Sequence, residues 1–127
     1  MLWNGTITVT LNDNEEEGLH SLQLDHILYF QLYKRKVFVH TARIVYLCPW
    51  NSMKMLYTLL SSSTNRFEKA DKDAIINVNN IKRLDNERLI AYFDDNGEYP
   101  DKYCYIANVH YPTIKRRLEE REAHSAQ

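Results

Sequence analysis

The chain has 127 residues, the size of one domain, and 44% of them are hydrophobic, enough to bury a single core. Its 16 basic and 17 acidic side chains leave a formal net charge of −1, so any binding to nucleic acid depends on local patches of charge. No apolar run approaches the ~20 residues of a transmembrane helix, and the amino terminus lacks a signal-peptide pattern. We therefore expect a cytoplasmic protein without a membrane span.

The first 20 residues are predicted to form an extension beside the main domain. Strict alternation over residues 6–11 predicts a half-buried strand, and its edge is a candidate for pairing two copies of the chain. The acidic stretch 12–18 has too little apolar surface to pack and predicts a loop. We expect the extension over 1–20, the main domain over 21–122 and a frayed tail over 123–127.

The main domain is predicted to be mainly β, a meander or sandwich of short strands with one packed helix and a C-terminal helix. Strands are expected over residues 27–33, 37–41, 43–48, 74–78, 89–93 and 103–107. The charged residues 67–73 are interpreted as a turn. Apolar residues at helical spacing predict a helix after Pro49, ended by the serine-rich stretch 61–65. A second helix is expected to start at Pro112 and to bury Ile114 and Leu118.

Catalytic and metal-binding motifs are scarce. Three glycines cannot supply a phosphate-binding or dinucleotide-binding loop, and the five histidines show no metal-site spacing. Cys48 and Cys104 lie in apolar strand patterns, where thiols are usually unreactive. The acidic stretch 94–98 resembles a calcium loop without its ligand spacing, so a hairpin turn is expected there. We expect no enzymatic activity, no metal and no cofactor.

Basic and polar side chains gather at three predicted turns. They are Lys34, Arg35 and Lys36 at the first, Arg66, Lys69 and Lys72 at the second, and Asn108 and His110 at the third. A single basic turn is most simply a solvated hairpin tip. Three turns whose side chains donate to phosphates or base edges favour an anionic partner, namely double-stranded DNA.

Several motifs resemble the LytTR-type DNA-binding domain of bacterial transcription regulators, over about residues 22–120. The first two similar motifs are Leu24-Asp25-His26-Ile27-Leu28-Tyr29 and Lys36-Val37-Phe38-Val39-His40-Thr41. The central one comprises Phe67, Lys69, Asp71, Lys72 and Asp73, followed by Ile75-Ile76-Asn77 and Ile81. The resemblance implies short β-strands with a helix against them, and loops that enter the major groove of DNA. The implied contacting loops are residues 33–36, 69–73 and 107–110.

The chain departs from the family pattern at two of these loops. Asp71 and Asp73 stand where the family has histidine and serine, and residues 107–109 replace a Ser-Arg pair. A carboxylate beside a phosphate costs on the order of one to a few kcal/mol, unless lysines neutralise it or it accepts from a cytosine amino group. Two hypotheses therefore stay open. One is a stand-alone transcription regulator that binds repeated DNA sites as a homodimer. The other is a non-enzymatic interaction or regulatory module that has lost DNA binding and contacts a regulatory protein.

Overall fold

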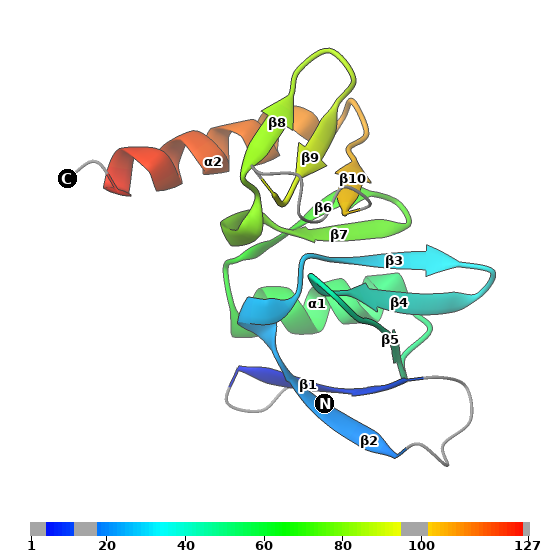
Figure 1. The fold of residues 1–127 in the computed structure, drawn as a ribbon. Coiled ribbons are helices and arrows are strands. Elements are labelled where there is room, and N and C mark those ends of the chain that lie inside the picture. The colour runs from blue at the N-terminus through cyan, green and yellow to red at the C-terminus, as the bar shows by residue number, and fades with distance from the viewer. Residues whose placement is uncertain (1–4, 12–17, 95–101, 126–127) are drawn as a thin grey trace.

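The computed structural model describes residues 5–11, 18–94 and 102–125, and these form two antiparallel sheets and two α-helices (Figure 1). The larger sheet has the strand order β2-β1-β5-β4-β3-β7-β6. Its strands are β1 (Thr6–Thr10), β2 (Leu19–Gln23), β3 (Tyr29–Tyr33), β4 (Lys36–His40), β5 (Val45–Cys48), β6 (Phe67–Asp71) and β7 (Ala74–Asn77). The smaller sheet has the order β10-β9-β8 and consists of β8 (Arg83–Asp85), β9 (Ile90–Tyr92) and β10 (Tyr103–Tyr105). The predicted mainly β class is confirmed.

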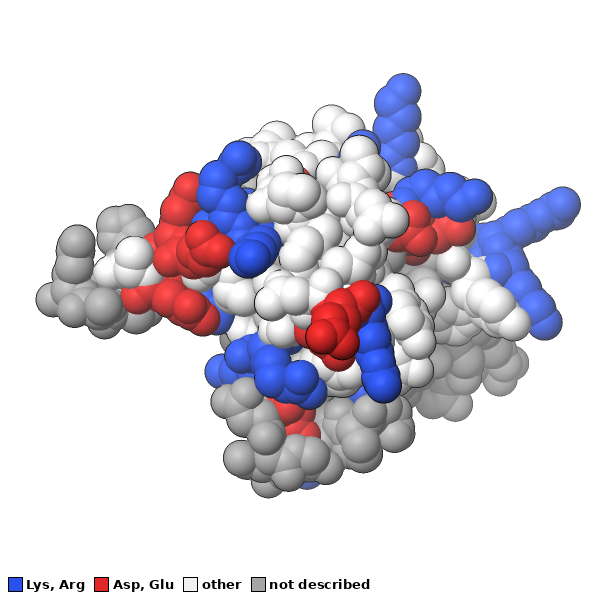
Figure 2. Space-filling view, turned by 90° about the horizontal axis from the view of Figure 1, so that it is seen from above, with Lys and Arg blue, Asp and Glu red and all other residues white. Residues whose placement is uncertain are grey.

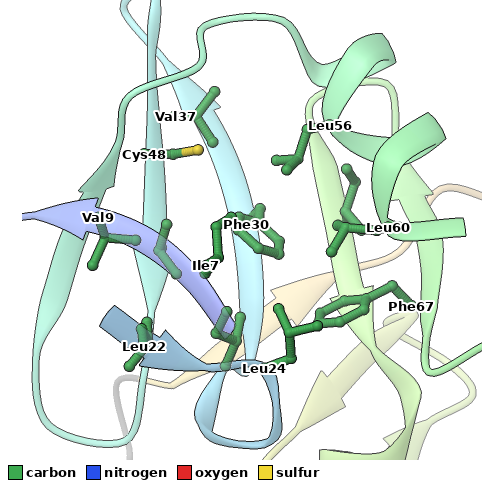
Figure 3. Close-up of a cluster of buried hydrophobic side chains, with 13 residues drawn as sticks. Ile7, Val9, Leu22, Leu24, Phe30, Val37, Cys48, Leu56, Leu60 and Phe67 are labelled. Carbon is green, nitrogen blue, oxygen red and sulfur yellow. The ribbon is translucent and has the colours of Figure 1, made fainter. Parts of the chain in front are cut away.

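Successive residues of the central strands point into two different cores. Phe30 and Ile75 pack with α1 (Met53–Ser63) and with Ile7 and Val9 of β1 in one cluster, drawn in Figure 3. Their neighbours Tyr29 and Ile76 face the smaller sheet and α2 (Tyr111–Ser125) in the other. Because both faces of β3 and β7 are covered, their sequences are apolar without strict alternation.

The two helices carry the apolar faces that their spacing predicts. In α1 the hydroxyl of Ser52 accepts from the Met55 N–H at 3.2 Å, and Leu56 and Leu60 are buried. The helix ends at Ser63 with Thr64 as its C-cap, inside the serine-rich stretch that was expected to end it. In α2 the predicted inner residues Ile114 and Leu118 are buried, and the helix continues through Ser125 into the expected frayed tail.

The expectation that residues 1–20 lie beside the domain is wrong for their first strand. Ile7 and Val9 are fully buried in the core, so β1 is integral to the larger sheet. β1 also lies between β2 and β5. β1 pairs with β2 along its whole length and with β5 only at Thr10, and the outer strand on this side of the described sheet is β2.

Three short or charged strands escaped prediction: β2, β6 and β8. Residues 67–71 form strand β6 rather than part of a turn, and the turn itself is confined to Lys72 and Asp73. The strand predicted from residue 43 begins at Val45. The acidic loop 12–17 and most of the predicted 94–98 hairpin turn lie outside the described residues.

Polar side chains join the elements around the start of β6 and the end of β7. Asn77, fully buried in β7, donates from Nδ2 to the carbonyls of Ile27 at 2.9 Å and Leu24 at 3.3 Å. Arg117 and Arg121 anchor α2, the latter through the carbonyls of Val78, Asn79 and Ile81. Among the described helices, none is long and apolar enough to cross a membrane.

Candidate nucleic-acid interface

The β3–β4 turn presents two cations on a strained backbone. Tyr33 pairs with Lys36, which leaves Lys34 and Arg35 as a two-residue turn with φ of 50° and 67°. Both positive angles are typical of a type I′ turn, for which Asn-Gly is the usual sequence. The Lys34 ammonium lies 5.3 Å from the Tyr33 ring centroid, and all four side chains of residues 33–36 are exposed. Strain of this kind concentrates at functional sites.

The β6–β7 turn lies at the same end of the larger sheet. β3 and β7 are antiparallel neighbours, and the Leu32 N–H donates to the Asp73 carbonyl at 2.8 Å. Within the turn, the Asp71 carboxylate accepts from the Lys72 N–H at 2.8 Å. The structure therefore brings the first and second predicted turns together, with Lys72, Asp71 and Asp73 beside the basic β3–β4 turn.

A β-bulge in β6 connects the third turn to the other two. Lys69 pairs with Ile75 and Asp71 with Ala74, so Ala70 is an extra residue without a partner on β7. Its carbonyl is free to accept from the Ala107 N–H at 2.7 Å. The bulge thus fixes residues 107–110, including Asn108 and His110, against the β6–β7 hairpin.

The third turn leads directly into α2. The His110 N–H donates to the Ala107 carbonyl at 3.0 Å, and Asn108 and Val109 are exposed. Because α2 begins at Tyr111, its amino terminus lies at this same end of the molecule. The partial positive charge of a helix amino terminus favours a phosphate there.

A groove of about 500 Å³ separates the third turn from α1. Its lining includes Lys54, Tyr57, Lys69, Lys72, Ala107 and His110. The Lys69 ammonium lies 4.9 Å from the Tyr57 ring centroid. Sequence reasoning identified Lys69 but missed Lys54 and Tyr57, although their spacing of three residues places them on one face of α1.

Tyr57 is held in place by a partly buried ionic network. Its hydroxyl donates to Glu68 Oε1 at 3.0 Å, and Arg117 Nη1 donates to Glu68 Oε2 at 3.0 Å and to the Phe67 carbonyl at 3.2 Å. Burial is the largest cause that raises the pKa of Tyr57. The network joins α1, β6 and α2 behind the groove, and this fixes the ring on which Lys69 rests.

The predicted placement of Arg66 with these turns is wrong. Arg66 precedes β6 at its other end, where it forms an ion pair with Asp25 and its carbonyl accepts from the Val78 N–H. The five residues of β6, roughly 16 Å of strand, separate it from the β6–β7 turn. The other predicted residues lie at the common end: Lys34, Arg35, Lys36, Lys69, Asp71, Lys72, Asp73, Asn108 and His110.

Charge at the end with the turns is mixed rather than uniformly basic. Figure 2 shows Lys and Arg side chains that project outward at the end opposite the C-terminal end of α2, with acidic side chains close to them. Such an end attracts phosphates at its projecting cations, whereas Asp71 and Asp73 restrict where a phosphate can lie. It can therefore contact DNA only in an orientation that keeps the carboxylates away from the backbone or pairs them with base donors.

The two cysteines are buried, and burial raises the pKa of Cys48. Burial and the nearby charge of Asp71 raise the pKa of Cys104 to about 12. Thiols of this kind are poor nucleophiles. Within the described part of the chain, no cluster of three or more His, Cys, Asp or Glu side chains can hold a metal ion.

Comparison with known proteins agrees with this geometry. The family model of the LytTr DNA-binding domain matches residues 17–119. A solved structure described as the LytTr DNA-binding domain of a methyl-accepting/DNA response regulator from Bacillus cereus has the same fold, with a TM-score of 0.68 and 18% identity. The match covers 91% of this chain and 97% of that one. No curated protein is significantly similar in sequence.

Proposed function

Because the chain belongs to the LytTr DNA-binding domain family, we propose that it is a bacterial transcription regulator whose three turns enter the major groove of double-stranded DNA. The observation that carries this proposal is the convergence of the β3–β4 turn, the β6–β7 turn and residues 107–110 at one end of the molecule. We assign it a binding role in the cytoplasm, without catalysis.

Each turn supplies a different kind of contact. Lys34 and Arg35 are exposed at the tip of the β3–β4 turn and suit phosphates or the guanine edge, which offers two acceptors to a basic side chain. Lys72 and Asn108 reach from the neighbouring turns, and an asparagine amide suits the adenine edge. Ordering costs remain low because the bulge and the strand pairing fix the backbone of all three turns.

One domain of this size offers few base contacts, so we propose that two copies bind repeats about one helical turn apart. β2 is the strand suited to join them, because it borders the larger sheet in Figure 1 and carries no charged side chain or proline. An uncharged, unprotected edge strand readily pairs with another copy.

The test is binding to genomic DNA fragments at several salt concentrations. Lys34→Ala, Arg35→Ala and Lys72→Ala should each weaken binding and reduce the salt slope by about one. The matched control is Arg43→Ala, which removes an exposed cation from the opposite end of β4. Equal losses in the control would refute the assigned interface. A wild-type chain that binds no fragment would instead favour the regulatory module with a protein partner.

A further inference from the structure

A second cavity lies directly behind the β6–β7 turn, on the side away from the groove beside α1. Its volume is about 340 Å³ and its lining is Tyr29, Gln31, Asp71, Asp73, Ala74, Tyr103, Cys104 and Tyr105. It therefore lies between β3, the β6–β7 turn and β10, and Figure 1 shows β10 beside β6 and β7. No lysine or arginine is part of this lining, whereas the groove beside α1 is rich in lysine.

The two carboxylates of this cavity, Asp71 and Asp73, lie near lysines but form no ion pair with them within the described residues. The effect of Asp71 extends into the cavity, because its charge adds to burial in raising the pKa of Cys104. Two carboxylates at the rim of a concave site favour a cation as ligand.

A tyrosine on the cavity floor also has a hydroxyl that opens on the cavity. Tyr29 is only 5% exposed, and its ring stacks on His40 at 4.2 Å and on Phe93 at 5.6 Å between centroids. Its hydroxyl nevertheless has no hydrogen-bond partner within the described chain, and the residue lines the cavity. Because the protein does not enclose it, this hydroxyl is available to a group that enters the cavity.

The walls of the cavity are aromatic. Tyr103 and Tyr105 meet edge to face with centroids 5.5 Å apart, and 38% and 63% of these residues are exposed. Exposed rings beside carboxylates are typical of sites for organic cations, which ring faces attract electrostatically. A metal ion fits less well, because within the described residues no set of three metal-binding side chains surrounds the cavity.

We propose that this cavity binds an alkylammonium or alkylguanidinium group, with Asp71 and Asp73 as countercharges, Tyr103 and Tyr105 as walls and the Tyr29 hydroxyl as acceptor. The group is either a free small cation or a lysine or arginine side chain. Asp71 lines both this cavity and the groove beside α1. The bound cation neutralises the two carboxylates near phosphate and raises DNA affinity about fivefold or more, an effect that rests on the proposed DNA binding.

Binding is tested first without DNA, by calorimetry on the whole chain at constant ionic strength. The probes are n-butylguanidinium and n-butylammonium, with n-butanol and MgCl₂ as controls. Saturable binding of the organic cations is expected, weakened at least about fivefold by Asp73→Asn and by Tyr105→Leu. Glu87→Gln, an exposed acid in the β8–β9 turn, should leave it unchanged. Circular dichroism confirms that each variant is folded.

The outcomes separate cleanly. No saturable binding, equal binding of butanol, binding of Mg²⁺ alone or insensitivity to both substitutions would each overturn the proposal. A neutral-ended peptide with a single arginine that binds more tightly than butylguanidinium identifies a protein side chain as the source, and the reverse identifies a free cation.

The link to DNA is measured separately, because the cavity titration needs no DNA and DNA binding needs no cation. Butylguanidinium should raise the DNA affinity of the wild type, and the Asp71→Asn, Asp73→Asn double variant should bind DNA more tightly without responding to it. A cation response of equal size in the double variant would show that the cavity does not act on DNA binding. If the wild type binds the cation but no DNA, the cavity stands and the proposed function fails.

Discussion

The Lys34-Arg35 turn should trade folding stability for DNA affinity. The change is the double substitution Lys34→Asn and Arg35→Gly, which places the preferred type I′ residues where φ is 50° and 67°. A left-handed conformation costs a residue other than glycine roughly 1 to 2 kcal/mol, and the substitution removes this strain from the folded state. Glycine also raises the conformational entropy of the unfolded chain, which cancels about half of the stability gained. Loss of the contact between Lys34 and the Tyr33 ring costs about 0.5 kcal/mol more. We therefore expect the free energy of unfolding to rise by about 1 kcal/mol.

DNA binding should move in the opposite direction. Removing two phosphate contacts should lower the slope of log affinity against log salt by about two. Urea denaturation followed by circular dichroism measures the stability, and fluorescence anisotropy with a labelled DNA fragment at four salt concentrations measures the binding. The expected combination is a more stable protein that binds DNA more weakly.

Two control variants separate strain from charge. Lys34→Gln with Arg35→Gln keeps the strained backbone and removes the charges, so it should lose affinity without gaining stability. Arg43→Gln with Lys82→Gln removes two exposed cations that line a cavity at the other end of the larger sheet, and it should change neither. An Asn-Gly variant no more stable than the wild type would refute the strain argument. An affinity loss of similar size in the distant pair would refute the location of the interface.

Three further predictions concern the rest of the fold. Burial, and then the charge of Lys102, lower the pKa of His40 from 6.5 to about 4. As the pH falls, the His40 imidazole is therefore protonated in the unfolded chain at a higher pH than in the folded one. The free energy of unfolding should fall by about 1 kcal/mol from pH 7 to pH 5, after allowance for solvent screening. Urea titrations at both pH values should show a smaller fall for His40→Phe. Arg66→Ala, which breaks the pair with Asp25, should cost at most about 1 kcal/mol and leave DNA affinity within about twofold in the anisotropy assay. Asn77→Ala removes one donor each from the Leu24 and Ile27 carbonyls, which keep the Ile27 N–H and the Asn80 amide, and should cost about 1 to 2 kcal/mol in urea denaturation.

The elements that could be predicted from the sequence are those whose apolar residues follow one period. Leu56 and Leu60 of α1 follow such a pattern and are buried as expected, whereas β7 was predicted from its continuous β-branched run. β2 buries a single side chain, Leu22, so its pattern is nearly that of a loop. In β6 the bulge at Ala70 breaks the period of two, and its two buried residues are separated by two that are not.

The one misplaced site residue follows from the same bulged strand. Interpreting residues 67–73 as a turn brings Arg66 close to Lys72, whereas the strand carries it to the far end of the sheet. The cavity behind the turn was beyond sequence reasoning for another reason. Tyr29, Asp73 and Tyr105 meet only because the smaller sheet packs over β3, and no local pattern records that contact.

The bulge at Ala70 sets a rule for re-engineering the specificity of this domain. Since the additional residue frees the one carbonyl that receives Ala107, the length of β6 determines where the third turn lies. The proposed DNA-contacting side chains at positions 34, 35, 72 and 108 can thus be exchanged as a set. Deleting a single residue from β6 would instead shift the third turn relative to the other two. Libraries that aim at new target sites should randomise those tips and keep the spacing between them constant.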